Sequence, residues 1–132
     1  MTLSNVTAAQ IAEGRRICEV VRVQNSYNLA HRSDDALIDD LARDGIAHVP
    51  FFPLGGFTPL QSAALSDVAK ELGATPMQVA LACLLRRAPN ILLIPGTSSL
   101  QHLRESLAAA NLALPIDKMA VLNRITAATA PA

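Results

Sequence analysis

Expected helices and strands alternate along this 132-residue chain, and the alternation limits its fold more than any other feature. Apolar and β-branched runs at residues 20–24, 46–52 and 90–94 are separated by segments whose apolar residues recur at helical spacing. Strands that are separated by helices form parallel sheets with right-handed crossovers. The sequence therefore predicts an α/β domain built from parallel β/α units.

Capping and turn residues set the expected bounds of the helices. Residues 7–10 and 75–78 have the spacing of a capping box, and Pro76 suits the first turn of a helix. Ser33 is expected to cap the second helix and Gly45 to end it. The expected helices are 7–17, 34–44, 61–72, 76–87, 99–111 and 116–127, with residues 3–5 as the remnant of a further strand.

The segment 90–106 carries the most informative motif. Its apolar run at 91–94 lacks alternation and is closed by a Pro-Gly pair, as in a strand buried on both faces of a parallel sheet. Three hydroxyl residues at 97–99 then stand where the next helix begins. There they can cap free backbone N–H groups or share those groups with a phosphate. In an eight-stranded β/α barrel, phosphate commonly binds after the last strands at a helix N-terminus.

The length and the number of strands indicate part of such a barrel. A complete β/α barrel has roughly 250 residues, and this chain offers three strands and a remnant. We expect about half a barrel in a single domain over residues 1–132, which would leave two parallel edge strands open. A hydrophobic share of 51% is high for so short a chain and indicates apolar surface beyond its own core.

Charge and cysteine usage narrow the class of protein. The net charge is zero with 17% charged residues, so neither a nucleic acid nor a membrane surface is expected as a partner. Residues 1–4 lack the features of a signal peptide, and the most apolar region, 79–94, is interrupted by two arginines and a proline. Cys18 and Cys83 are expected to be buried reduced thiols. We expect a soluble, cytoplasmic protein.

Polar and aromatic residues fall at the ends of the expected strands, where parallel β/α units place their working residues. Ser4, Asn5 and Gln24 can form hydrogen bonds with a planar carboxamide, and Phe51 can stack on its ring. Alternatively, Ser4 and Asn5 cap the helix that begins at Thr7, and Phe51 belongs to the core. The pattern leaves both readings open.

These residues resemble one family of enzymes. Ser4-Asn5, Val23-Gln24, Phe51–Gly55 and Ile94–Ser99 continuing to Glu105 are similar, in order and spacing, to the second half of an aldo-keto reductase. The likeness covers nearly the whole chain. It implies a (β/α)8 barrel of the TIM type, of which this chain would hold strands five to eight, with the N-terminal half of the barrel absent. It also implies that NADPH binds across the C-terminal face and that aldehydes or ketones are reduced.

The resemblance assigns roles to the residues near the nicotinamide. Ser4, Asn5 and Gln24 would hold the nicotinamide carboxamide. Phe51 stands where many members have a Tyr that stacks on the ring, so the stacking survives without the hydroxyl. Pro53, Leu54 and Gly55 would begin the loop that lies over the pyrophosphate.

The resemblance also assigns an adenosine side, made of Gly96, Thr97, Ser98, His102, Glu105 and Ser106. The first three would surround the ribose and its 2′-phosphate, and Glu105 would meet the adenine. Gly96 and His102 stand where many members have Lys and Arg, so fixed positive charge is lost and NADH remains an alternative to NADPH. Ser106 replaces a frequent Asn.

The family's catalytic Asp, Tyr, Lys and His lie in the first four β/α units, and no residue here corresponds to them. Tyr27, the only tyrosine, follows Gln24 in a loop, and Lys70 and Lys118 fall on helices. Because reduction needs an aligned proton donor, we expect no catalytic residue, no metal ligands and no activity from the chain alone. The expected partners are a nicotinamide dinucleotide, a small carbonyl substrate in the full-length protein, and either the missing half or a second copy. The alternative is a non-catalytic nucleotide- or phosphate-binding half-barrel that acts as an oligomeric module.

The pattern also predicts the orientation of two polar side chains on the expected strands. Arg22 shares parity with Gln24 and would point into the barrel, so we expect it to find a carboxylate or turn to solvent. His48 shares parity with Ile46 and is expected to face the helices with its polar atoms satisfied.

Overall fold

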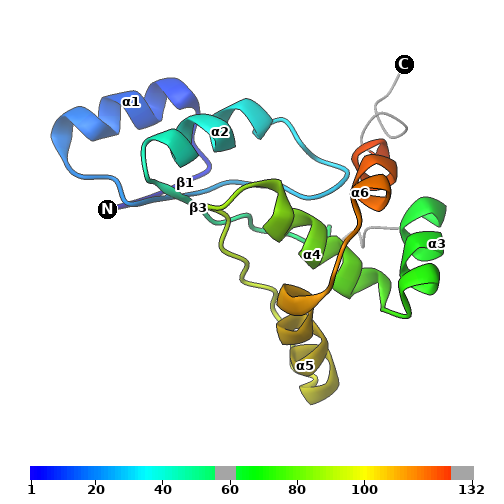
Figure 1. Ribbon diagram of the computed structural model, residues 1–132. Helices are drawn as coiled ribbons and strands as arrows, with labels where there is room; N and C mark the ends of the chain where they lie inside the picture. Colours follow the sequence, from blue (N-terminus) through cyan, green and yellow to red (C-terminus); the bar gives the residue numbers. More distant parts are fainter. Residues whose placement is uncertain (56–61, 126–132) are drawn as a thin grey trace.

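The structure is a computed structural model in which residues 1–55 and 62–125 are described (Figure 1). Its parallel sheet has the order β1 (Thr2–Ser4), β2 (Arg22–Gln24), β3 (Ala47–His48). Ser4 pairs with Gln24 and Val23 pairs with His48. The predicted α/β class with parallel strands is confirmed, and the register aligns the carboxyl ends of the strands at one edge.

Two helices join these strands and lie together on one side of the sheet in Figure 1: α1 (Ala8–Ile17) and α2 (Asp35–Arg43). Thr7 caps α1 with the predicted capping box, and Gly45 follows α2 with φ +70°. The prediction that Ser33 caps α2 is wrong, because Asp34 occupies that position. The Asp34 side chain makes no capping bond, since its carboxylate accepts from the Asn25 amide at 2.7 Å.

The second half of the chain is helical and is arranged around α4 (Pro76–Arg87). Thr75 begins this helix with the predicted capping box, and six consecutive residues, 79–84, are buried. The helix contacts α3 (Ala63–Leu72), α5 (Leu100–Ala108) and the short 3-10 helix η1 (Ala109–Asn111), and α6 (Ile116–Asn123) contacts α3. The expected ends of two helices, at 61 and at 126–127, lie outside the described residues.

Two apolar clusters hold the elements together. The larger one joins Tyr27 and Ile38 to α3, α4 and α6, with Val79 and Leu122 fully buried. The smaller one lies between the sheet and helices α1 and α2 and includes Val23. Both sides of the molecule thus have an apolar interior made mostly of aliphatic side chains.

The predicted fourth strand is reduced to a single bridge. Ile91 pairs with His48 in parallel, and the Leu92 N–H donates to the His48 carbonyl at 2.9 Å. Leu92 and Ile94 are 55% and 57% exposed, so the prediction of a strand buried on both faces is wrong. The reason is that β3 lies on one side only, and no strand among the described residues pairs with the other edge.

Other predictions have mixed outcomes. Arg22 is exposed, and its Nε donates to the Thr2 hydroxyl at 2.6 Å. Of the two predicted outcomes for this side chain, the structure therefore has the one in which it turns to solvent. Both cysteines are free, and Cys83 is buried, but Cys18 is only half-buried because it lies beside the chain start near Met1. No single helix of the described residues is long and apolar enough to cross a membrane, although α3 and α4, bent by 94° where they meet, pass the same test as a pair.

Candidate functional site

The ends of β1 and β2 bring Ser4, Asn5 and Gln24 together. Ser4 lies opposite Gln24 in the sheet, and the Asn5 N–H donates to the Gln24 carbonyl at 2.8 Å. Asn5 has φ +54°, a left-handed conformation that Asn tolerates better than most residues. Thr7 caps α1, so the alternative in which Ser4 and Asn5 cap that helix is wrong.

Phe51 lies beside the same strand ends. Its N–H donates to the Asn25 carbonyl at 3.0 Å, and it bridges Ser26 in parallel. Its ring meets that of Phe52 edge to face, with centroids 5.3 Å apart. Phe51 is only half-buried and Phe52 is exposed, so Phe51 is not a core residue. Phe52 adopts φ +56°, which turns the chain sharply after the strand.

A cavity of about 400 Å³ opens next to these rings. Its lining comes from the loop after β3 and from the segment after Ile91, namely Phe51, Phe52, Pro53, Leu54, Ile94, Pro95 and Gly96. Two segments that are about forty residues apart in the sequence thus form one apolar hollow at the strand ends. Four of the predicted site residues belong to it.

A second cavity, of about 510 Å³, shares Leu54 with the first. It lies between the N-termini of α4 and α5 and is lined by Leu54, Leu65, Thr75, Pro76, Met77, Ala80, Gln101, His102 and Glu105. The Glu105 carboxylate accepts from Gln101 Nε2 at 3.0 Å. Both volumes fall in the range of small-molecule sites. The shared Leu54 makes the two cavities neighbours along one surface.

Seven predicted residues line neither cavity: Ser4, Asn5 and Gln24 at the strand ends, and Gly55, Thr97, Ser98 and Ser106. Thr97 and Ser98 are exposed, and the Thr97 hydroxyl accepts from the Ser99 N–H at 3.0 Å, while Ser99 caps α5. Ser106 is half-buried on α5. The Gly55 N–H donates a hydrogen bond to the Phe52 carbonyl at 3.0 Å, which closes the turn between these two residues.

Sequence reasoning missed the contribution of α4. The second cavity is lined in part by Thr75, Pro76 and Met77, but their sequence pattern predicted only the start of a helix. Their proximity to Glu105 depends on how α4 packs against α5, which no local pattern gives.

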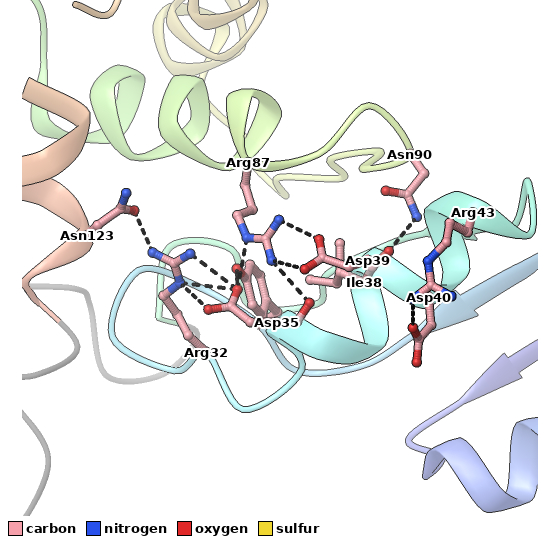
Figure 2. A network of polar contacts seen from close by, with 10 residues as sticks. Arg32, Asp35, Ile38, Asp39, Asp40, Arg43, Arg87, Asn90 and Asn123 are labelled. Atoms are coloured by element: carbon pink, nitrogen blue, oxygen red, sulfur yellow. Dashed lines mark hydrogen bonds and ion pairs between the residues drawn. The ribbon is translucent and has the colours of Figure 1, made fainter. Parts of the chain in front are cut away.

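The only tyrosine of the sequence lines neither cavity and belongs to a polar network around Asp35, whose charged members are labelled in Figure 2. The buried Tyr27 hydroxyl donates to Asp35, and burial together with this bond raises the pKa of Tyr27 to about 12. Arg87 Nε donates to Asp35 at 3.0 Å and its Nη1 to Asp39 at 2.8 Å. Hydrogen bonds from Tyr27 and Arg32 outweigh the effect of burial and hold the pKa of Asp35 below its ordinary value. The network joins the loop after β2 to α2 and α4.

His48 is fully buried, and neither ring nitrogen has a hydrogen-bond partner among residues 1–55 and 62–125. The prediction that its polar atoms are satisfied is wrong. The nearest carboxylate oxygen, Asp34 Oδ2, lies 3.8 Å from Nε2 and already accepts from Asn25. Burial lowers the pKa of His48, with Asp34 opposing that effect. Across residues 1–55 and 62–125, no three His, Cys, Asp or Glu side chains gather as metal ligands would.

Comparison with known proteins gives consistent likenesses. A sequence model described as the aldo/keto reductase family matches residues 1–127. Pyridoxine 4-dehydrogenase of Escherichia coli (strain K12) is 68% identical over 124 residues, which are 94% of this chain and 43% of that protein. A thermostable aldo-keto reductase in complex with the inhibitor epalrestat superposes with a TM-score of 0.84 at 29% identity, over 92% of this chain and 46% of that one.

A further aldo-keto reductase structure, complexed with NADPH, shares the fold with a TM-score of 0.76 at 23% identity, over 92% of this chain and 40% of that one. The chain thus spans less than half the length of the relatives it matches.

Proposed function

Because the chain belongs to the aldo/keto reductase family, we propose that it provides the cofactor-binding face of a nicotinamide-dependent oxidoreductase. The observation that carries the proposal is the pair of cavities that meet at Leu54. One lies beside the strand ends and Phe51, and the other reaches Glu105 on α5. An extended dinucleotide has two nucleoside ends joined by a pyrophosphate, so two neighbouring cavities that share one lining residue suit its shape.

Within this proposal each part of the surface has a task. Ser4, Asn5 and Gln24 offer amide and hydroxyl groups to a carboxamide, and Phe51 offers a ring face. The turn at residues 53–55 lies beside the pyrophosphate. Glu105 can accept from an exocyclic amine of adenine, with its carboxylate held by Gln101. The bound dinucleotide supplies the hydride.

We propose NADPH as the cofactor, with NADH as the alternative. The solved relative that is complexed with NADPH supports the class of cofactor. Gly96 has no side chain, and His102, exposed on α5, is the basic residue in the lining of the second cavity. A 2′-phosphate would therefore meet less fixed positive charge than an Arg or Lys supplies, and the preference for NADPH should be small.

For the substrate we propose an aromatic alcohol and aldehyde pair of the pyridoxine type, on the strength of the 68% identical relative. Reduction moves a hydride to the carbonyl carbon and a proton to its oxygen. Tyr27 is a poor donor for that proton, because its hydroxyl is buried, bound to Asp35 and has a pKa of about 12. We therefore propose that the chain alone is inactive and that the proton donor lies on other β/α units of the barrel.

The test is a titration followed by complementation. The purified chain is titrated with NADPH and NADH, and it is then mixed with the part of the Escherichia coli relative that it does not match. We expect nucleotide binding by the chain alone and oxidation of pyridoxine only in the mixture. A chain that binds no nucleotide would refute the cofactor site, and activity without the complement would refute the proposed division of roles.

The exposed edge at Leu92 and Ile94 favours a second candidate, a non-catalytic nucleotide-binding module that pairs with a second copy. A dimer that binds NADPH and gains no activity from the complementing part would favour this candidate. A cytoplasmic location and the absence of nucleic-acid and membrane partners remain predictions from the sequence.

A further inference from the structure

Asn25 is connected to the residues that we place around the nicotinamide, although it is not one of them. The residue is 7% exposed. Its Oδ1 accepts from the Val6 N–H at 3.0 Å, and its Nδ2 donates to the Val6 carbonyl at 2.8 Å. Its backbone carbonyl accepts from the Phe51 N–H at 3.0 Å. The loop after β1 and the backbone at Phe51 are thus both fastened to the residue next to Gln24.

Asp34 determines which way the Asn25 amide faces. The Asn25 Nδ2 donates to Asp34 Oδ2 at 2.7 Å, and an ionised carboxylate can only accept. The amide nitrogen must therefore face Asp34 and the Val6 carbonyl, which leaves the amide oxygen for the Val6 N–H. Both N–H groups of the amide and its oxygen have partners. The Asp34 carboxylate makes no capping bond to α2, so this contact does not compete with helix formation.

These bonds hold a backbone turn that a chain of L-residues does not adopt readily. Asn5 is left-handed, with φ +54°, and its N–H donates to the Gln24 carbonyl. The next residue, Val6, is held at both its N–H and its carbonyl by Asn25. Loss of the Asn25 amide would free Val6 and let the turn relax, which would move Ser4 and Asn5 relative to Gln24.

We propose that Asn25 is a positioning residue for the carboxamide end of the dinucleotide, because it sets Ser4, Asn5 and Phe51 around Gln24. The inference rests on the proposed function. The residues of the cavity between α4 and α5 make no hydrogen bond with Asn25 among the described contacts. Its influence should therefore be confined to one end of the ligand.

The experiment is a calorimetric titration of the chain and its variants with two ligands, NADPH and 2′,5′-ADP, of which the second lacks the nicotinamide. Asn25→Asp replaces the amide nitrogen by an oxygen that faces the Val6 carbonyl and the Asp34 carboxylate. We expect NADPH to bind about tenfold more weakly and 2′,5′-ADP to bind within about twofold of wild type. Asn111→Asp, an exposed site on η1, adds the same charge and should bind both ligands as wild type does.

Two substitutions of Asp34 give a second test of the proposed role of Asn25, which holds even if Asn25→Asp does not fold. Asp34→Asn keeps an oxygen acceptor and should bind NADPH nearly as wild type does, whereas Asp34→Leu leaves an amide N–H unpaired and should weaken NADPH alone. Unchanged NADPH affinity, or equal losses for both ligands, would overturn the assignment. Wild-type protein that binds neither ligand would instead refute the proposed function, and this inference with it, before any substitution is made.

Discussion

At the scale of single residues, buried polar groups decide how the molecule responds to pH. Tyr27 is fully buried with its hydroxyl bonded to Asp35, whereas the ring nitrogens of the fully buried His48 form no hydrogen bond within the described part of the chain. The two rings meet edge to face, with centroids 5.7 Å apart. Tyr27 therefore stays neutral to a higher pH than an exposed tyrosine, because burial raises its pKa, and His48 stays neutral to a lower pH than an exposed histidine, because burial lowers its pKa.

Tyr27→Phe should alter stability in alkali. The folded chain holds the pKa of Tyr27 near 12, above the unfolded value of 10.0, so its contribution is fully present below pH 10 and is lost as the pH rises from 10 to 12. We expect wild type to lose about 1 to 2 kcal/mol of unfolding free energy between pH 9 and pH 11, beyond any loss in Tyr27→Phe. Urea unfolding at pH 9 and pH 11 measures this difference, and parallel losses in both proteins would contradict it.

His48→Leu should alter stability in acid. The folded pKa of His48 is below the unfolded value of 6.5, so as the pH falls through 6.5 the unfolded chain takes up a proton that the folded chain resists. Wild type should lose stability between pH 7 and pH 5, and the variant should lose less because it has no group to protonate. At pH 7 the two should differ by less than about 1.5 kcal/mol. Urea unfolding at pH 7 and pH 5 measures both losses, and a variant as acid-sensitive as wild type would show that another group causes the loss.

At the scale of elements, local signals predicted the helices well, and contacts between elements escaped prediction. Thr7 with Gln10 and Thr75 with Gln78 begin helices because both partners of the cap lie within four residues. The run at 91–94 has the composition of a buried strand, yet only Ile91 bridges a neighbour, because pairing depends on a second strand. The second cavity was missed for the same reason, since α4 and α5 meet only in the folded chain.

Arg87 should be the main polar link between α4 and α2, and Arg87→Met tests this. The side chain binds both Asp35 and Asp39, as drawn in Figure 2, and it is 20% exposed. We expect the variant to lose about 1 to 2 kcal/mol of unfolding free energy, since Asp35 and Asp39 each lose the ion pair with Arg87. Arg86→Met, at the exposed neighbouring position, should cost less than about 0.5 kcal/mol. Equal losses in the two variants would refute a special role for Arg87.

At the scale of the whole molecule, the sheet that the described residues form has an open edge. Among the described residues, Ile91 bridges His48 of β3 on one side, and no strand pairs with its other side. A further hollow of about 320 Å³, with Ala47, Pro89 and Leu92 in its lining, lies at this edge. Unpaired parallel edges and exposed aliphatic side chains favour association. The sequence predicted this openness from strand number and apolar content, and the structure locates it at Leu92 and Ile94.

Leu92→Glu should therefore reduce self-association. We expect wild type to sediment increasingly as a dimer between about 1 and 100 μM, and the variant to need roughly tenfold higher concentration for the same dimer fraction. Leu107→Glu changes an exposed leucine away from this edge, on α5, and this variant should self-associate as wild type does. Analytical ultracentrifugation decides this, and equal effects of both substitutions would show that general hydrophobicity, not the open edge, drives association.

Leu54, the side chain common to both cavities, has a practical consequence for inhibitor chemistry. Two fragments, one seated on either side of it, could be joined by a short tether that passes over a single leucine. The second fragment would then arrive at high effective concentration, so the joined compound should exceed the potency of either piece by orders of magnitude. A bulkier side chain at position 54 would clash with the tether and would therefore weaken the binding of the joined compound only.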